Sequence, residues 1–253
     1  MGKSILFAAK EGAGKTYQAM GYYASMLKMK PDAKPAVLID TEYKANLTLD
    51  TQFKGLKLEI IECQEFVVDA EKGQVDLDVL ATLKSIRKEV RRTLSRALKN
   101  EISLIIFDSM MGLRTPFCQT EWELEKGKEA VSPDAWRQIN DKVREIVFPL
   151  VNVAKLRPVD VLIMAPIIDR YEVIDKKYGI SQIVGEELGV KDWLASQAQY
   201  IVELRKDTKK MKYFAAIAKS PRGMQELTHE TIFNGPDVKW SDASFMSLYY
   251  YLL

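Results

Sequence analysis

The sequence predicts an α/β fold, with a mainly parallel central sheet flanked by helices and an antiparallel edge near the C-terminus. Short apolar runs of strand length alternate with longer segments of helical periodicity, which is the pattern of parallel strands joined by crossover helices. The last two runs are separated only by a short charged turn, which indicates an antiparallel pair. Apolar residues make up 47% of the 253 residues, enough for one large domain over residues 1–253.

Each segment can be assigned in chain order. The apolar runs predicted as strands lie at 4–9, 36–40, 56–63, 102–108, 159–165, 199–205 and 211–218. The segments with helical spacing lie at 17–28, 76–99 and 133–156, followed by a C-terminal helix or interface segment at 245–253. Pro149 is expected to kink or divide the third of these helices. Residues 110–132 and 167–190 show neither pattern and are predicted to be loops.

A glycine-rich loop joins the first strand to the first helix. It reads Lys10-Glu11-Gly12-Ala13-Gly14-Lys15-Thr16, and Tyr17 follows. Its glycines let backbone N–H groups approach a phosphate, and the helix N-terminus adds partial positive charge. In such a phosphate-binding loop the lysine meets the β- and γ-phosphates and the threonine is a Mg²⁺ ligand. The loop therefore predicts ATP binding by the residues from Lys10 to Tyr17, although Ala9 replaces the motif's first glycine.

Two later strands end in acids. Asp108 closes the run at 102–108, and Glu42 follows the run at 36–40 in Asp40-Thr41-Glu42. Ligands of parallel sheets bind at the carboxyl ends of the strands. We therefore predict Thr16 and Asp108 as the Mg²⁺ ligands and Glu42 as the base that activates water. The alternatives are a helix cap or loop acid at Asp108 and a surface acid at Glu42.

Asp40-Thr41-Glu42 after one buried strand and Asp108-Ser109 at the end of another resemble the core of the RecA/RadA recombinases. The resemblance spans about residues 3–222 as an order of motifs and is most specific at 9–16, 40–42 and 108–109. It implies a RecA-like P-loop ATPase fold with Glu42 as the catalytic base. Because the chain starts at the first core strand, it is most similar to compact phage, archaeal-virus and recombinase-paralogue members.

The resemblance also covers the segment after the last strand. Lys219 and Arg222 lie in Ala218-Lys219-Ser220-Pro221-Arg222-Gly223, which resembles the segment that reaches a neighbouring subunit's nucleotide. They are the implied trans-acting catalytic cations of a homo-oligomeric ring or filament; an ordinary turn is the alternative. Pro166 lies near the family's polar γ-phosphate sensor, which leaves Asp169 or Arg170 as candidates.

The two predicted loops, at 110–132 and 167–190, occupy the same positions in the order of motifs as the DNA-binding loops of recombinases. Cations and aromatic residues that suit single-stranded DNA occur there, at Arg114, Trp122, Lys126, Lys128, Arg170, Tyr171, Lys176, Lys177 and Tyr178. Nearby acids offset these charges, so the alternatives are that these loops bind a protein partner or are disordered. The helix at 76–99 has a basic outer face that is either solvated or in contact with DNA, with Lys84, Arg87, Lys88, Arg91, Arg92, Arg96 and Lys99.

Composition narrows the function. A net charge of +2 does not indicate a generally basic nucleic-acid binder, and one histidine excludes a histidine-based metal site or triad. The cysteine content and the absence of a long apolar run favour a cytoplasmic protein that does not span a membrane. The sequence thus predicts a Mg²⁺-dependent ATPase in DNA recombination, repair or replication, oligomeric on single-stranded DNA. A KaiC-like regulatory module with protein partners and a slow nucleotide-binding scaffold are the alternatives.

Overall fold

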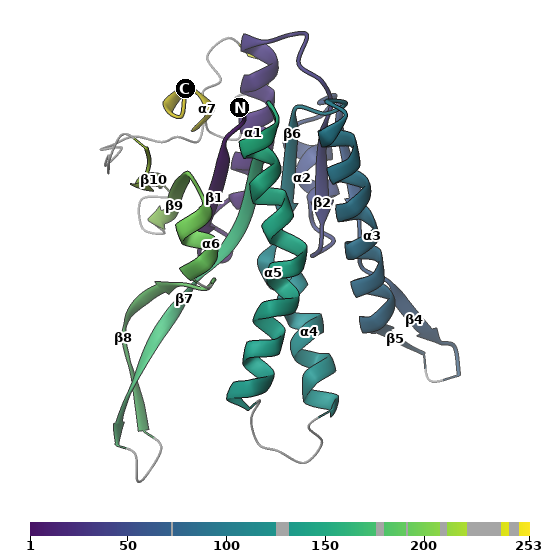
Figure 1. The fold of residues 1–253 in the computed structure, drawn as a ribbon, viewed down its shortest axis with the longest axis vertical. Helices are drawn as coiled ribbons and strands as arrows, with labels where there is room; N and C mark the ends of the chain where they lie inside the picture. The colour runs from purple at the N-terminus through teal and green to yellow at the C-terminus, as the bar shows by residue number, and fades with distance from the viewer. Residues whose placement is uncertain are drawn as a thin grey trace.

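A mainly parallel sheet forms the centre of the molecule in the computed structural model (Figure 1). The structure describes residues 1–71, 73–124, 132–175, 180–190, 192–207, 212–221, 239–242 and 248–253. The strand order is β10-β9-β1-β7-β6-β2-β3, and only β10 is antiparallel to its neighbour along this path. The strands are β1 (Ser4–Ala9), β2 (Ala36–Asp40), β3 (Leu58–Glu62), β6 (Leu104–Asp108), β7 (Asp160–Asp175), β9 (Tyr200–Asp207) and β10 (Lys212–Lys219). The predicted fold class is confirmed.

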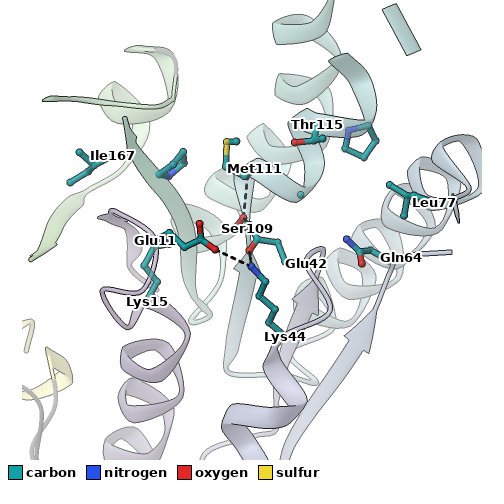
Figure 2. A pocket seen from close by; sticks show the side chains of 13 residues that line it. Glu11, Lys15, Glu42, Lys44, Gln64, Leu77, Ser109, Met111, Thr115 and Ile167 are labelled. Carbon is teal, nitrogen blue, oxygen red and sulfur yellow. Dashed lines mark hydrogen bonds and ion pairs between the residues drawn. The ribbon is translucent and has the colours of Figure 1, made fainter. Parts of the chain in front are cut away.

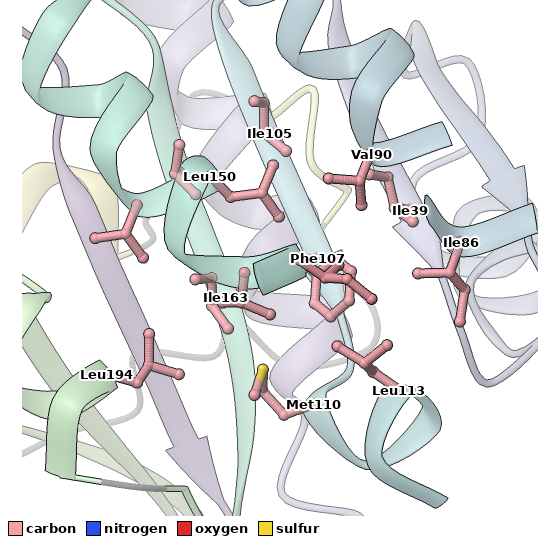
Figure 3. Close-up of a cluster of buried hydrophobic side chains, with 14 of the residues drawn as sticks. Ile39, Ile86, Val90, Ile105, Phe107, Met110, Leu113, Leu150, Ile163 and Leu194 are labelled. Carbon is pink, nitrogen blue, oxygen red and sulfur yellow. The ribbon is translucent and has the colours of Figure 1, made fainter. Parts of the chain in front are cut away.

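Helices cover both faces of this sheet. One face packs against α1 (Lys15–Met29) and α7 (Leu248–Tyr251), and the other against α3 (Val79–Leu98), α4 (Met110–Leu124), α5 (Pro133–Leu156) and α6 (Asp192–Gln197). Alternate residues of β6 show the division, since Ile106 belongs to the first core and Ile105 and Phe107 to the second (Figure 3). Burial on both faces explains why these strands are continuous apolar runs in the sequence.

Two β-hairpins extend from the body of the molecule. The long strand β7 leaves the sheet and pairs with β8 (Ile180–Leu188), while β4 (Phe66–Asp69) and β5 (Gln74–Leu77) form a separate two-stranded sheet. In Figure 1 the β7–β8 hairpin extends to the lower left of the molecule and the β4–β5 hairpin to the lower right, near the lower end of α3. The lower end is also the side of the sheet where β1, β2 and β6 end.

Several predicted boundaries agree with the structure. The helix α5 begins at Pro133 and ends at Leu156, and Ser132 caps it by accepting the Ala135 N–H at 3.2 Å. Pro149 lies inside this helix without dividing it. The helix predicted at 76–99 begins at Val79, because Asp78 accepts the Ala81 N–H at 2.8 Å as its N-cap.

Three predictions of local structure were wrong or incomplete. The segment predicted as irregular from residue 110 forms α4, despite Gly112 and Pro116. Much of the loop predicted at 167–190 is the β7–β8 hairpin. The β4–β5 hairpin and the short α2 (Ala45–Gln52) were not predicted. Each of these elements depends on neighbours from elsewhere in the chain or on a short polar sequence, which local periodicity does not reveal.

Candidate nucleotide-binding site

The glycine loop has the backbone that a phosphate cradle requires. Gly12 and Gly14 have φ angles of 73° and 81°, which side chains rarely tolerate. Ala9 is the last residue of β1, fully buried, and is not among the residues with positive φ. An alanine therefore fits where the motif has its first glycine, because the left-handed conformations fall later in the loop.

Lys15 lies folded against this loop. Its Nζ donates to the carbonyl oxygens of Ala9 at 3.2 Å and Lys10 at 3.4 Å. Burial lowers the pKa of Lys15, an effect opposed by the nearby carboxylates of Asp108 and Glu42. The ammonium group is thus held where it can move from loop carbonyls to a phosphate.

Thr16 and Asp108 meet at the end of β6. The Thr16 hydroxyl donates to Asp108 Oδ2 at 2.5 Å. Burial raises the pKa of Asp108 to about 6, and the neighbouring acids Asp40 and Glu42 act in the same direction, while the hydrogen bond from Thr16 and the charge of Lys15 oppose them. Two hard oxygen donors beside a buried group of acids fit the ligand preference of Mg²⁺.

The turn after β2 wraps around the carboxylate of Asp40. Asp40 Oδ1 accepts the backbone N–H groups of Glu42 and Tyr43, both at 2.8 Å. Oδ2 accepts those of Lys44 at 2.8 Å and Ala45 at 2.7 Å. These bonds start α2 and fix the direction of the chain at Glu42. They also occupy the oxygens of Asp40, so that of these two acids Glu42 lines the cavity.

Glu42 is held over the end of β6. The hydroxyl of Ser109 donates to Glu42 Oε1, and Lys44 Nζ lies 3.5 Å from Glu42 Oε2. The two strand ends are joined as well: Ser109 N–H donates to Thr41 Oγ1 at 2.7 Å, and Thr41 Oγ1 donates to the Ser109 carbonyl at 2.9 Å. The Asp108–Ser109 peptide is cis. Glu42 and Asp108 are thus placed by one connected set of hydrogen bonds.

A cavity of about 490 Å³ lies over these residues (Figure 2). Lys15, Glu42, Lys44 and Ser109 line its polar side. Its remaining walls come from the glycine loop, the segment after β3, β5, α4 and β7, with Glu11, Gln64, Leu77, Met111, Gly112, Thr115, Pro116, Pro166 and Ile167. The volume is in the range of small-molecule sites.

The other residues of the loop differ in their surroundings. Lys10 Nζ forms an ion pair with Asp169 Oδ1 at 2.9 Å, which ties the loop to β7 at one of the two sensor candidates. The exposed Glu11 lies 3.5 Å from Lys44 Nζ. Tyr17 packs against Phe53 with ring centroids 5.0 Å apart, and it does not line the cavity.

The predicted trans-acting and DNA-binding residues lie elsewhere or outside the described residues. Lys219 Nζ donates to the carbonyls of Ala195 and Ser196, each at 2.8 Å, so that in this chain it caps the end of α6. Arg222 lies outside the described residues. Arg114 is half-buried with its guanidinium 4.8 Å from the centre of the Trp136 ring. The other predicted DNA-binding side chains, from Trp122 to Lys128 and from Arg170 to Tyr178, are not described.

Sequence reasoning did not foresee several supporting residues. It gave no role to Asp40, to the Ser109 hydroxyl, to Lys44 or to Gln64, whose Nε2 donates to the Thr41 carbonyl at 3.1 Å. Only Asp40 carried a usable signal, since an aspartate just before a short polar turn and a helix is typical of a capping residue. The others lie in segments that only the fold brings together.

Within the described ranges, no cluster of three or more histidine, cysteine or acidic side chains is arranged to bind a metal alone. The described helices include none with the length and apolar character needed to cross a membrane.

A buried strand, a glycine loop and a helix, with acids at neighbouring strand ends, define the P-loop nucleotide-binding class of α/β protein. No family model and no curated protein matches the chain. Among solved structures, a KaiC-like protein of the hyperthermophilic archaeon Pyrococcus horikoshii OT3 is similar over 88% of this chain and 83% of that chain, with 12% identity and a TM-score of 0.49. A likeness at this identity and TM-score does not indicate the function of this chain.

Proposed function

We propose that the chain is a Mg²⁺-dependent ATPase of the RecA-like type. The observation that carries this proposal is the convergence of Lys15 and Glu42 on one cavity, beside the buried pair of Thr16 and Asp108. A site of this kind binds a triphosphate through the glycine loop and places a carboxylate near the terminal phosphate.

Each residue has a separate task in the proposed reaction. The loop N–H groups and Lys15 bind the phosphates, and Lys15 stabilises negative charge on the terminal phosphoryl group. Thr16 and Asp108 hold Mg²⁺, which neutralises phosphate charge when it is bound. Glu42 orients the attacking water and accepts its proton. Asp40 is an unsuitable base because its oxygens already accept the N–H groups of residues 42–45.

We further propose that the ATPase works as a homo-oligomer. The β4–β5 hairpin supports this, because Phe66, Val68 and Val75 are 49%, 66% and 64% exposed on it. Phe66 pairs with Leu77, and Val68 with Val75, so these side chains share one face of the hairpin. Leu77 also lines the nucleotide cavity. A two-stranded sheet is only marginally stable alone, and a neighbouring subunit on this face would cover it beside the nucleotide.

Single-stranded DNA is the proposed effector, in a role in recombination, repair or replication, with Lys219 and Arg222 as the proposed trans-acting cations. The hairpins and the ends of α4 and α5 extend from the nucleotide side of the ribbon (Figure 1), and we place the proposed DNA contact there. One observation favours the second candidate, a KaiC-like ATP-dependent module with protein partners. Arg114 packs on Trp136 rather than projecting into solvent, which removes one cation from the proposed DNA surface.

The proposed function can be tested by ATP turnover in Glu42→Gln. Loss of the base is expected to reduce turnover by about 100-fold or more, while bound ATP is retained. Glu62→Gln is the matched control, because Glu62 ends β3 opposite Asp40 in the parallel register but does not line the cavity. Unchanged turnover in Glu42→Gln would contradict the assignment of the base, and ATP binding without turnover in the wild type would favour the scaffold.

The same preparation separates the two candidate roles. Turnover and oligomer size are measured with and without single-stranded DNA. Stimulation that is lost in Glu42→Gln supports the DNA role. Turnover that ignores DNA, with no DNA retained at moderate salt, favours the module with protein partners.

A further inference from the structure

The helix α3 carries an unusual concentration of positive charge. Its 20 residues contain six lysines or arginines and one acid. Lys84, Arg87, Lys88, Arg91 and Arg92 are all exposed. The helix alone therefore has a larger net positive charge than the whole chain, whose formal net charge is +2.

Much of this charge is not neutralised by the protein. The only acid of the helix, Glu89, is 9% exposed and is shared by Lys88 at 3.6 Å and Arg92 at 3.4 Å. Arg96 pairs with Glu59 at 2.7 Å. Lys84, Arg87 and Arg91 form no ion pair with the part of the chain that the structure describes. They follow one another at steps of three or four residues, so they lie along one side of the helix.

A groove runs beside these cations, between α3 and α5. Its volume is about 290 Å³, with Arg87 and Arg91 on the α3 side and Glu145 on the α5 side. The remaining lining is apolar, from Val90, Leu94, Ile146 and Pro149. The guanidinium of Arg87 lies over the ring of the buried Phe117, 5.6 Å from its centre, and this contact helps to fix the position of the Arg87 side chain. Two guanidinium groups thus flank an apolar floor, with a single acid opposite them.

We propose that α3 and this groove bind the phosphate backbone of a single nucleic-acid strand. The helix is about 30 Å long, which allows a row of phosphates to follow its cations. The apolar floor suits the faces of unpaired bases, and arginine is well suited to phosphate. An acidic protein segment would use the charges but leave the apolar floor without a regular partner.

This surface is distinct from the nucleotide cavity, with which it shares no lining residue. Binding to it does not require ATP hydrolysis. It also lies outside the segments 110–132 and 167–190 that correspond to recombinase DNA loops. The chain would therefore contact a strand on the side of α3 as well as, or in place of, the lower end of the molecule.

The test is binding of a fluorescent oligothymidylate to the full chain without nucleotide, over a series of salt concentrations. Arg87→Gln/Arg91→Gln is expected to weaken binding at least about fivefold and to reduce the slope of log K against log salt by about 1.4, which is the loss of two phosphate contacts on a single strand. Arg87→Lys/Arg91→Lys should retain most of the salt slope, since it keeps the charges.

Two further variants separate this site from general charge and from misfolding. Lys84→Gln/Lys99→Gln removes one exposed cation of α3 and the exposed cation at its C-cap. It leaves the Phe117 contact in place and should also weaken binding. Lys54→Gln/Lys57→Gln makes the same charge change at exposed positions outside α3 and should bind like the wild type. Arg87→Gln/Arg91→Gln and Lys84→Gln/Lys99→Gln should both keep basal ATP turnover, and Glu42→Gln should keep oligothymidylate binding. Loss of strand binding and loss of ATP turnover are therefore measured independently.

The proposal is overturned if the wild type does not bind, or if Arg87→Gln/Arg91→Gln and Lys84→Gln/Lys99→Gln both bind as tightly as the wild type. It is also overturned if Lys54→Gln/Lys57→Gln weakens binding as much as they do. Polyglutamate is the competitor that tests the class of partner. If it displaces the oligothymidylate as well as unlabelled oligothymidylate does at equal charge, the surface recognises acidic protein and the nucleic-acid assignment is wrong.

Discussion

At the scale of single residues, the position of Glu42 depends on Asp40. Each oxygen of Asp40 accepts two backbone N–H groups from the turn that contains Glu42. The carboxylate is almost fully buried, at 1% exposure. Hydrogen bonds to a charged acceptor contribute more than neutral ones, and buried donors are costly when they lose their acceptor. Asp40 therefore acts as a positioning residue beneath the proposed base.

Asp40→Asn tests this role with almost no change in side-chain size. The amide nitrogen would face two N–H groups in place of an oxygen, so we expect the free energy of unfolding to fall by about 2–4 kcal/mol. Urea unfolding measures the loss. Asp50→Asn, at an exposed position of α2, should change stability by less than about 0.5 kcal/mol. Equal stability of the Asp40 variant and the wild type would show that the turn does not rely on the carboxylate.

At the scale of elements, the start of α4 is fitted against the end of β2. A Cβ on Gly112 would lie 2.3 Å from Thr41 Oγ1 and 2.4 Å from the Thr41 carbonyl oxygen. Thr41 cannot withdraw easily, because its hydroxyl is bonded to Ser109 and its carbonyl accepts from Gln64. A glycine at position 112 therefore allows α4 to approach Thr41 closely. From the sequence alone, the same glycine suggests an interruption of the helix.

Gly112→Ala is expected to destabilise the protein by about 1–3 kcal/mol. The clash outweighs the gain of up to about 1 kcal/mol that alanine brings to a helix. Because the displaced Thr41 also holds Ser109, ATP turnover should fall as well. Thermal unfolding and turnover are compared with Gly185→Ala, where a Cβ meets nothing within 4 Å. A variant that is more stable than the wild type would mean that α4 can shift without cost.

A comparison of the elements shows which parts of the fold the sequence predicts and which it does not. The strands at 4–9, 36–40 and 102–108 and the helix at 133–156 were predictable, because burial on both faces or an amphipathic stripe leaves a clear pattern. The carboxyl ends of these three parallel strands lie at one edge of the sheet, so Lys15, Glu42 and Asp108 were expected to lie near one another. The helix α4 and the β7–β8 hairpin were missed, since contacts with distant strands outweigh the glycine and proline signals of the local sequence.

At the scale of the whole molecule, ligand binding and stability are linked. The proposed nucleotide would contact residues at the ends of β1, β2 and β6, which are separate in sequence and line one cavity. A ligand that binds only the folded state stabilises it by about 2.7 kcal/mol at a concentration 100-fold above its Kd. Nucleotide binding is therefore measurable as a change in the melting temperature of the entire chain, even where turnover is slow.

We expect Mg²⁺ with a non-hydrolysable ATP analogue at that concentration to raise the melting temperature by roughly 5–10 °C, because about 1 kcal/mol corresponds to 2–4 °C in a chain of this size. Lys15→Ala should lose most of the rise, since the phosphates lose their cation, whereas Glu42→Gln should keep it, since the base acts only on water. Lys57→Ala, at an exposed position outside the site, should match the wild type. Chelation of Mg²⁺ should reduce the rise in the wild type. A full rise in Lys15→Ala would place the nucleotide away from the glycine loop, and a rise that is unchanged by chelation would contradict the pairing of Thr16 with Asp108 as metal ligands.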